Sequence, residues 1–216
     1  MGNAPPALTP EILLRAYAMG VFPMAEHQDA PDIFWVNPEW RGILPLADFH
    51  ISKSLTRRIR RGEYRVTLNT SFEGVLDACA DRSETWINRE IHCLYKALHE
   101  QGHAHSIEIH QDGVLTGGAY GVAIGGVFFG ESMFSRRTDA SKLALAHLTD
   151  HLLRCGFRLL DTQFITPHLT SLGAQEISRA AYHVKLADAI AIETSIHALP
   201  LDQDFYSVLQ RNTQRA

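Results

Sequence analysis

Three polar side chains, two carboxylates and one amide, stand where apolar strands are predicted. Glu131 lies in the stretch GVFFGESMF, where its carboxylate follows a run of apolar residues. A buried charge of this kind is costly unless a partner meets it. Asp161 and Gln163 lie two apart at the end of the strand FRLLDTQ and therefore share one face. Such a pair can orient or polarise an amine, or it can simply cap the following turn.

Metal and serine chemistry are both poorly supported. The chain has 12 histidines, and His103 and His105 share a strand face, but no third ligand stands at a recognisable spacing and HExxH is absent. Ser132 lies in GESMF, which lacks the second glycine of GxSxG. We therefore expect no metal site and no serine nucleophile.

Two basic clusters contrast with the net charge of −4. The first lies on one face of the helix predicted from SKSLTRRIRR and consists of Lys53, Arg57, Arg60 and Arg61. The second is the turn SRRTDASK, which supplies Arg136, Arg137 and Lys142 but no glycine to cradle a pyrophosphate. Each cluster alone could be a solvated face. Together with the aromatic-rich residues 22–45, they favour contact with an RNA backbone.

The amino-terminal elements can be predicted from caps and periodicity. Thr9 and Pro10 begin a helix that Gly20 ends, and Ser52 caps the basic helix. Residues 22–45 are expected to form an ordered loop with short extended pieces. A strand is predicted over residues 64–68, and helices over residues 72–79 and 91–98.

The remaining elements should position the polar residues. Turns at Asp112-Gly113 and Gly125-Gly126 predict a meander of three antiparallel strands. A helix capped by Asp139, the strand FRLLDTQ and a helix over residues 175–190 follow, while the tail after Ala198 stays undecided. Gly117, Gly118 and Gly121 in the meander could mark tight packing or leave room for a flat ligand.

The order of these elements is that of an acetyltransferase-like fold, an analogy that is compatible with acyl transfer. We predict an α/β (α+β) fold with a small N-terminal domain over residues 1–62, which includes the basic helix. An acetyltransferase-like (GNAT-like) C-terminal domain is predicted over residues 63–216.

Composition places the chain among ordinary globular proteins, with 45% hydrophobic and 20% charged residues. No apolar run reaches the roughly 20 residues that a membrane helix needs, and MGNAPPALTPEIL is not a secretory signal. The three isolated cysteines suit a reducing compartment. We therefore expect a cytoplasmic protein that does not bind membranes.

Several motifs together resemble one family. GVFPM, FWVNPEWRGILP, FHISKSL, GHAHSIEI, GGAYGVAIG, GESMFSR, DASKLAL, LLDTQ and HLTSLGA occur in this order between about Leu8 and Tyr182. In these stretches the chain resembles leucyl/phenylalanyl-tRNA–protein transferases. The resemblance implies transfer of Leu or Phe, and less well Met, from aminoacyl-tRNA to proteins that begin with Arg or Lys, which creates an N-degron for protein degradation. It also implies a monomer without a coenzyme.

The resemblance also implies roles for individual residues. Asp161 and Gln163 would be the catalytic pair, with Gln163 contacting the reacting amine and Asp161 polarising it. Glu131 would lie beside the bound aminoacyl end, and Trp86 would hold the terminal adenosine. The pocket for the amino-acid side chain would be lined by Ala119, Phe128, Leu145 and Leu160.

Two positions depart from the family's pattern. The upstream motif GLLA-x-GGDLS is present only as LTPEILLRAY, and Met24 stands where a tryptophan is usual. A methionine can still pack beneath a base or a leucine side chain, but aromatic stacking is lost. We therefore expect Met24 to belong to the substrate site, with an altered grip on the adenosine or an altered balance between Leu and Phe.

Two other functions fit the same elements. A coenzyme A-dependent N-acetyltransferase would share the fold, although the turn SRRTDASK lacks the glycines that such enzymes use. A non-catalytic RNA-binding module would bind tRNA and leave peptides that begin with Arg unmodified.

Overall fold

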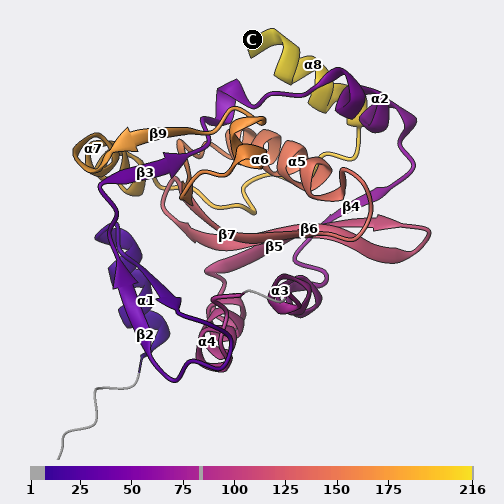
Figure 1. The fold of residues 1–216 in the computed structure, drawn as a ribbon. Helices are drawn as coiled ribbons and strands as arrows, with labels where there is room; N and C mark the ends of the chain where they lie inside the picture. Colours follow the sequence, from indigo (N-terminus) through magenta and orange to yellow (C-terminus); the bar gives the residue numbers. More distant parts are fainter. Residues whose placement is uncertain (1–7, 83–84, 216) are drawn as a thin grey trace, which may run out of the picture.

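A seven-stranded sheet in the order β4-β5-β6-β7-β8-β3-β9 runs through the molecule (Figure 1). The computed structural model describes residues 8–82 and 85–215. The central strands are β5 (Ala104–Gln111), β6 (Val114–Ile124) and β7 (Val127–Ser135), and they form the predicted antiparallel meander. Gly113 and Gly125 have positive φ angles in its two turns, a conformation that glycine adopts without steric cost.

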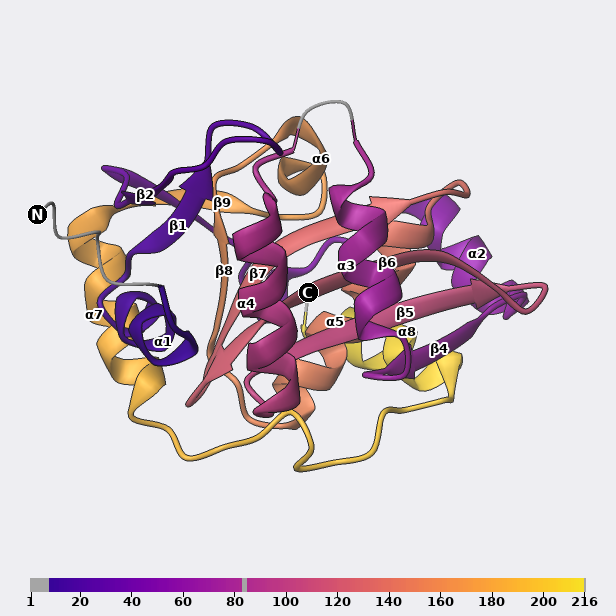
Figure 2. The same ribbon diagram turned by 90° about the horizontal axis from the view of Figure 1, so that it is seen from below.

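The fourth central strand sets the geometry of the site. After the meander, α5 (Ala140–Arg154) crosses back so that β8 (Leu159–Gln163) pairs in parallel with β7. This pairing ends at Phe129 and Asp161. Beyond that point the two strands diverge, which is visible from the other direction in Figure 2.

Helices cover both faces of the sheet and enclose two hydrophobic clusters. One face carries α3 (Phe72–Ala80) and α4 (Arg89–Glu100), and α1 (Pro10–Ala18) packs beside α4 (Figure 1). The other face carries α5. Because neighbouring strand residues point to opposite faces, Phe129 packs in the first cluster and Phe128 in the second.

The predicted extended pieces in residues 22–45 are three short strands. A separate two-stranded sheet is formed by β1 (Phe22–Ala25) and β2 (Ile33–Val36). In contrast, β3 (Trp40–Ile43) lies in the large sheet between β8 and β9 (Gln175–Ser178). The division into two domains at residue 62 stays a prediction. Strand β3, which precedes residue 62, pairs with β8 and β9, which follow it.

The basic helix α2 (Lys53–Arg61) begins as predicted, with the Ser52 side chain accepting from the Leu55 amide and with Leu55 and Ile59 buried. It contacts α8 (Phe205–Arg215), which occupies the undecided tail. Strand β4 (Arg65–Leu68) pairs with β5. Short helices η1 (Leu46–Asp48) and α6 (Pro167–Thr170) complete the elements that matter for the site.

Two helix starts differ in detail from the predictions. Asp139 is the N-cap residue of α5 as predicted, but its side chain forms no capping hydrogen bond; its φ angle is 64° and its carboxylate pairs with Lys142 at 3.0 Å. The helix expected from Gln175 begins later, as α7 (Arg179–Ile190), because residues 175–178 pair with β3 as strand β9. No helix within the described residues has the length and apolar character needed to span a membrane.

Candidate active site

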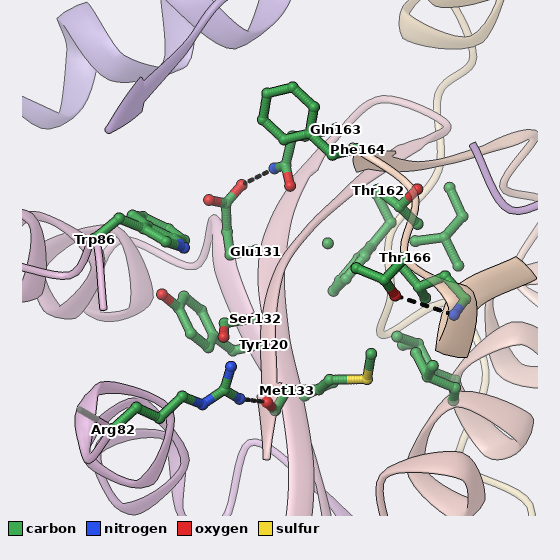
Figure 3. Close-up of a pocket in the computed structure, with 17 residues that line it drawn as sticks. Arg82, Trp86, Tyr120, Glu131, Ser132, Met133, Thr162, Gln163, Phe164 and Thr166 are labelled. Carbon is green, nitrogen blue, oxygen red and sulfur yellow. Dashed lines mark hydrogen bonds between the residues drawn. The ribbon is translucent and has the colours of Figure 1, made fainter. Parts of the chain in front are cut away.

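A cavity of about 260 Å³ lies where β7 and β8 separate. Its wall includes residues of β6, β7, β8, α5 and α6, together with Trp86 from the segment before α4. A β-bulge shapes this wall. Tyr120 pairs with Ser132 and Gly121 pairs with Gly130, so Glu131 is the extra residue of β7. The bulge presents the Glu131 carboxylate to the space between the strands (Figure 3).

Glu131 and Gln163 meet across the divergence of the two strands (Figure 3). Gln163 Nε2 donates to Glu131 Oε1 at 2.9 Å, and the Tyr95 hydroxyl donates to Oε2 at 2.6 Å. Tyr95 in turn shares a short hydrogen bond with the Tyr17 hydroxyl. Burial raises the pKa of Glu131 to about 7, against the opposing effect of the tyrosine hydroxyls. The carboxylate can therefore both bind and release a proton near neutral pH.

Asp161 lies behind this pair and does not line the cavity. Its carboxylate accepts from Arg41 Nη2 at 2.6 Å and Nε at 2.9 Å, and from the Tyr182 hydroxyl at 2.6 Å. It also accepts from the backbone N–H of Gln163 at 2.8 Å. Arg41 itself is buried between the rings of Phe22 and Tyr182. Asp161 thus contacts the main chain of Gln163, and both of its carboxylate oxygens accept hydrogen bonds from within the protein.

The backbone of Gln163 explains why only one member of the predicted pair faces the cavity. Its φ angle is 57°, an uncommon conformation for a residue other than glycine. This turn at the end of β8 directs the Gln163 side chain to Glu131, while Asp161 faces Arg41. The alternation of side chains along a regular strand predicted that Asp161 and Gln163 share one face. That prediction does not hold, because the backbone turns at Gln163.

The four pocket residues implied by the resemblance all line the cavity. They are Ala119, Phe128, Leu145 and Leu160. Sequence reasoning missed Met133, Leu148 and Leu169, which lie on the same apolar side. Trp86 also lines the cavity, near its polar side (Figure 3). Met24 does not line it, and is instead half-buried on β1 against the first hydrophobic cluster.

The glycines of β6 serve close packing. A Cβ added to Gly117 would lie 2.5 Å from the Cβ of Ala140 on α5, and one added to Gly121 would lie 2.5 Å from the Phe128 ring. Both distances are shorter than van der Waals contact allows. Of the two readings left open for these positions, tight packing is therefore correct.

The basic residues lie outside the cavity. Lys53, Arg57, Arg60 and Arg61 are exposed on α2, and none forms an ion pair with a described residue. In the second cluster, Arg137 pairs with Asp112 and Lys142 pairs with Asp139. Arg136 is exposed and lies over the Phe134 ring at 5.5 Å. The described histidines, cysteines and acidic residues include no group of three that could hold a metal ion.

Sequence reasoning also missed Arg41, Tyr95 and Tyr182, which set the positions of Asp161 and Glu131. Arg41 offered a signal, since it lies in the apolar stretch WRGIL and a buried cation needs a carboxylate. Glu131, in contrast, accepts hydrogen bonds from hydroxyl and amide donors and forms no ion pair with a cation among the described residues.

Solved structures confirm the acetyltransferase-like fold. FemX matches 77% of this chain and 66% of its own chain with a TM-score of 0.51 and 12% identity. A parallel pair of strands that separate around a cavity, within a mixed seven-stranded sheet, defines the chain as a member of this structural class.

Sequence comparisons define the family. The family model for leucyl/phenylalanyl-tRNA protein transferase matches residues 43–187, and the model for its N-terminal domain matches residues 7–39. A leucyl/phenylalanyl-tRNA–protein transferase of Cereibacter sphaeroides strain KD131 is 59% identical over 97% of this chain and 98% of its own length. One from Ruegeria pomeroyi is 58% identical over 96% and 99%. The chain belongs to the leucyl/phenylalanyl-tRNA–protein transferase family.

Proposed function

We propose that this enzyme transfers Leu or Phe, and less well Met, from aminoacyl-tRNA to the N-terminal Arg or Lys of proteins and so marks them for degradation. The observation that carries the proposal is the Glu131–Gln163 pair at the edge of an apolar pocket. The pocket suits an apolar amino-acid side chain. The polar pair lies where the carbonyl carbon and the attacking amine would meet.

The reaction requires little activation, because an aminoacyl ester is already reactive and positioning accounts for much of the rate gain. The amine nitrogen of the acceptor forms a bond to the ester carbonyl carbon, the bond from that carbon to the ribose oxygen breaks, and the amine loses a proton. Because Gln163 Nε2 donates to Glu131, the Gln163 amide oxygen is available to accept from the amine. Glu131, with a pKa of about 7, can take up the proton that the amine loses and return it to the ribose oxygen, which leaves as a hydroxyl.

Asp161 acts in this scheme as a positioning residue. It holds the Gln163 main chain in its unusual conformation through the hydrogen bond to the Gln163 N–H. This differs from the direct polarisation of the amine that the resemblance implied. Its charge is balanced by Arg41 and not by substrate.

The apolar pocket selects the transferred residue by shape. Each methylene gained or lost in such a pocket changes binding by roughly 1–3 kcal/mol. Ala119 is small and lies opposite Met133 in the sheet register, and both line the cavity. A flexible methionine facing an alanine leaves room for Phe and Met as well as Leu.

The tRNA would contact the exposed cations of α2 and Arg136. The cations lie outside the cavity and have no ion-pair partner among the described residues; they are Lys53, Arg57, Arg60 and Arg61 of α2, together with Arg136. Exposed arginines and lysines of this kind bind phosphates of an RNA backbone. They would hold the body of the tRNA while the cavity takes its aminoacyl end.

One experiment tests the proposed function directly. The protein is incubated with charged leucyl-tRNA and a peptide beginning with Arg, with and without ribonuclease, and the peptide mass is measured. We expect the mass of one added Leu only in the sample without ribonuclease. Acetyl-coenzyme A binding in calorimetry, unaffected by tRNA, would support the N-acetyltransferase instead. Binding of tRNA with an unmodified peptide would support the RNA-binding module.

A further inference from the structure

We propose that the Tyr120 hydroxyl belongs to a nucleoside subsite in the polar half of the cavity, where it hydrogen-bonds the free ribose 2′-hydroxyl of the aminoacyl donor. This assignment rests on the proposed function and adds a recognition contact to it. It concerns a side chain to which neither the motifs nor the proposed mechanism gives a role.

The cavity has two chemically different halves. Toward α5 and α6 its wall is mainly apolar and includes Met133, Leu148 and Leu169, although Thr162 and Thr166 also lie on this side. The side toward α3 and α4 carries Arg82, Trp86, Tyr120 and Ser132 (Figure 3). Glu131 lies between the halves (Figure 3). An amino-acid side chain in the apolar half would therefore leave the ester-linked ribose on the polar side.

Tyr120 is fully buried, yet its hydroxyl has no hydrogen-bond partner among the described residues. Its ring packs edge-on against Tyr95 at 5.4 Å and Phe72 at 5.9 Å, which fixes its position. The Tyr95 hydroxyl, by comparison, is bound to Glu131. Native proteins seldom leave a buried hydroxyl unpaired, and such groups commonly have a role outside the protein's own contacts. Tyr120 lines the cavity, and a ligand that reaches its buried hydroxyl would supply the missing partner.

The chemistry of the surroundings selects a ribose hydroxyl. Burial and the nearby Glu131 raise the pKa of Tyr120, so its hydroxyl stays protonated and can donate or accept. Trp86 packs edge-on against Tyr95 at 6.5 Å, so a base stacked on Trp86 would place its ribose next to the Tyr95–Tyr120 wall. A hydroxyl that can both donate and accept suits a ribose hydroxyl, which offers the same two roles.

Arg82 lies on the same polar side of the cavity. It is exposed, it is the one cationic residue among the described residues of the cavity wall, and it donates to the Met133 carbonyl (Figure 3). A long side chain held by a single hydrogen bond can move at small cost. Its movement would open the polar half, and its charge suits the phosphate that precedes the terminal nucleoside.

The test compares two minimal donors, 3′-O-leucyl-adenosine and its 2′-deoxy counterpart, with the parent enzyme and Tyr120→Phe. We expect the variant to raise the KM for the ribose donor about tenfold, the effect of one lost hydrogen bond in a closed site, with little change in kcat. The parent should show the same loss with the deoxy donor, and the variant should show no further loss. Because Tyr120→Phe removes an unpaired hydroxyl, its urea midpoint should not fall.

Tyr64→Phe is the matched control, since it removes a buried hydroxyl that is bound to His147 at 2.8 Å and lies outside the cavity. It should lower the urea midpoint and leave both KM values unchanged. An unchanged KM in Tyr120→Phe, or equal losses with both donors, would overturn the assignment. If the parent transfers Leu from neither donor, nor from leucyl-tRNA, the proposed function fails and the subsite fails with it.

Discussion

Glu131 is the one carboxylate among the described residues of the cavity wall, and its raised pKa makes activity sensitive to pH. Below a pH of about 7 the carboxylate is protonated and cannot accept the proton that the amine releases. The acceptor amine, with an ordinary pKa of about 8, must also be uncharged to react. Below neutral pH, log kcat/KM should therefore increase as pH increases, with a slope that approaches two.

Glu131→Gln should reduce this slope to that of the amine alone and lower the maximal rate by about 10²-fold, as is typical of lost general-base assistance. The measurement is the pH profile of Leu transfer to an Arg peptide, with folding checked by circular dichroism. A variant that keeps the steeper slope would show that another group accepts the proton.

Substitutions of Asp161 and Gln163 should have different effects on the free energy of unfolding. Asp161→Asn weakens the buried pair with Arg41, which is 1% exposed, so unfolding free energy should fall by about 3 kcal/mol as activity falls. Gln163→Ala should keep most of the stability and lower the transfer rate by about 10²-fold. Urea unfolding and single-turnover transfer measure the two effects. Parental stability in Asp161→Asn would contradict the positioning role.

At the level of elements, α2 has one apolar face that is buried and one basic face that is exposed. Leu55 and Ile59 are buried against the body of the protein, whereas Arg57 and Arg60 are exposed. Replacing these two arginines with alanine should weaken tRNA binding and reduce the slope of log K against log salt by about 1.5, because each RNA phosphate contact contributes about 0.7. Filter binding at several salt concentrations gives this slope.

A matched control for α2 is the double change of Arg158 and Lys185 to alanine, which removes the same charge from exposed positions elsewhere. It should leave the salt slope nearly unchanged. Transfer from leucyl-adenosine should be normal in both double variants, since neither pair lies on the cavity. Equal loss with leucyl-adenosine and leucyl-tRNA would show that α2 is needed only for folding.

For the whole molecule, buried histidines set the response to acid. Burial lowers the pKa of His105 and His147 to about 4, below the unfolded value of about 6.5. Their contribution to stability is complete above that unfolded value and is lost as pH falls toward about 4. Glu131 acts in the opposite sense, because its raised pKa favours the folded state as pH falls below about 7.

We therefore expect the melting temperature to fall as pH is lowered from about 6 to about 4. In this range the histidines bind protons in the unfolded chain but not in the folded protein. His147→Gln should make this decline shallower, and Glu131→Gln should make it steeper by removing the opposing contribution. Thermal melts followed by circular dichroism at half-unit pH steps test both. Parallel pH profiles for all three proteins would rule out these groups as the cause.

Most of the local structure and the family could be predicted from the sequence. The apolar pocket residues were implied by the resemblance to the family, whereas the caps at Thr9 and Ser52 and the glycine turns of the meander depend on neighbouring residues. These effects act over a few residues, so they can be recognised without knowing the fold. The motif order likewise pointed to the transferase family that the comparisons show.

The separate roles of the polar residues could not be predicted, because they depend on tertiary contacts. Arg41 and Asp161 are 120 positions apart, and Glu131 and Gln163 are 32 apart, so no local pattern pairs them. The end of β7–β8 pairing, the bulge at Glu131 and the positive φ of Gln163 turn one carboxylate into the cavity and the other away from it. Which buried charge meets a cation depends on contacts between distant strands, and those contacts exist only once the whole sheet has formed.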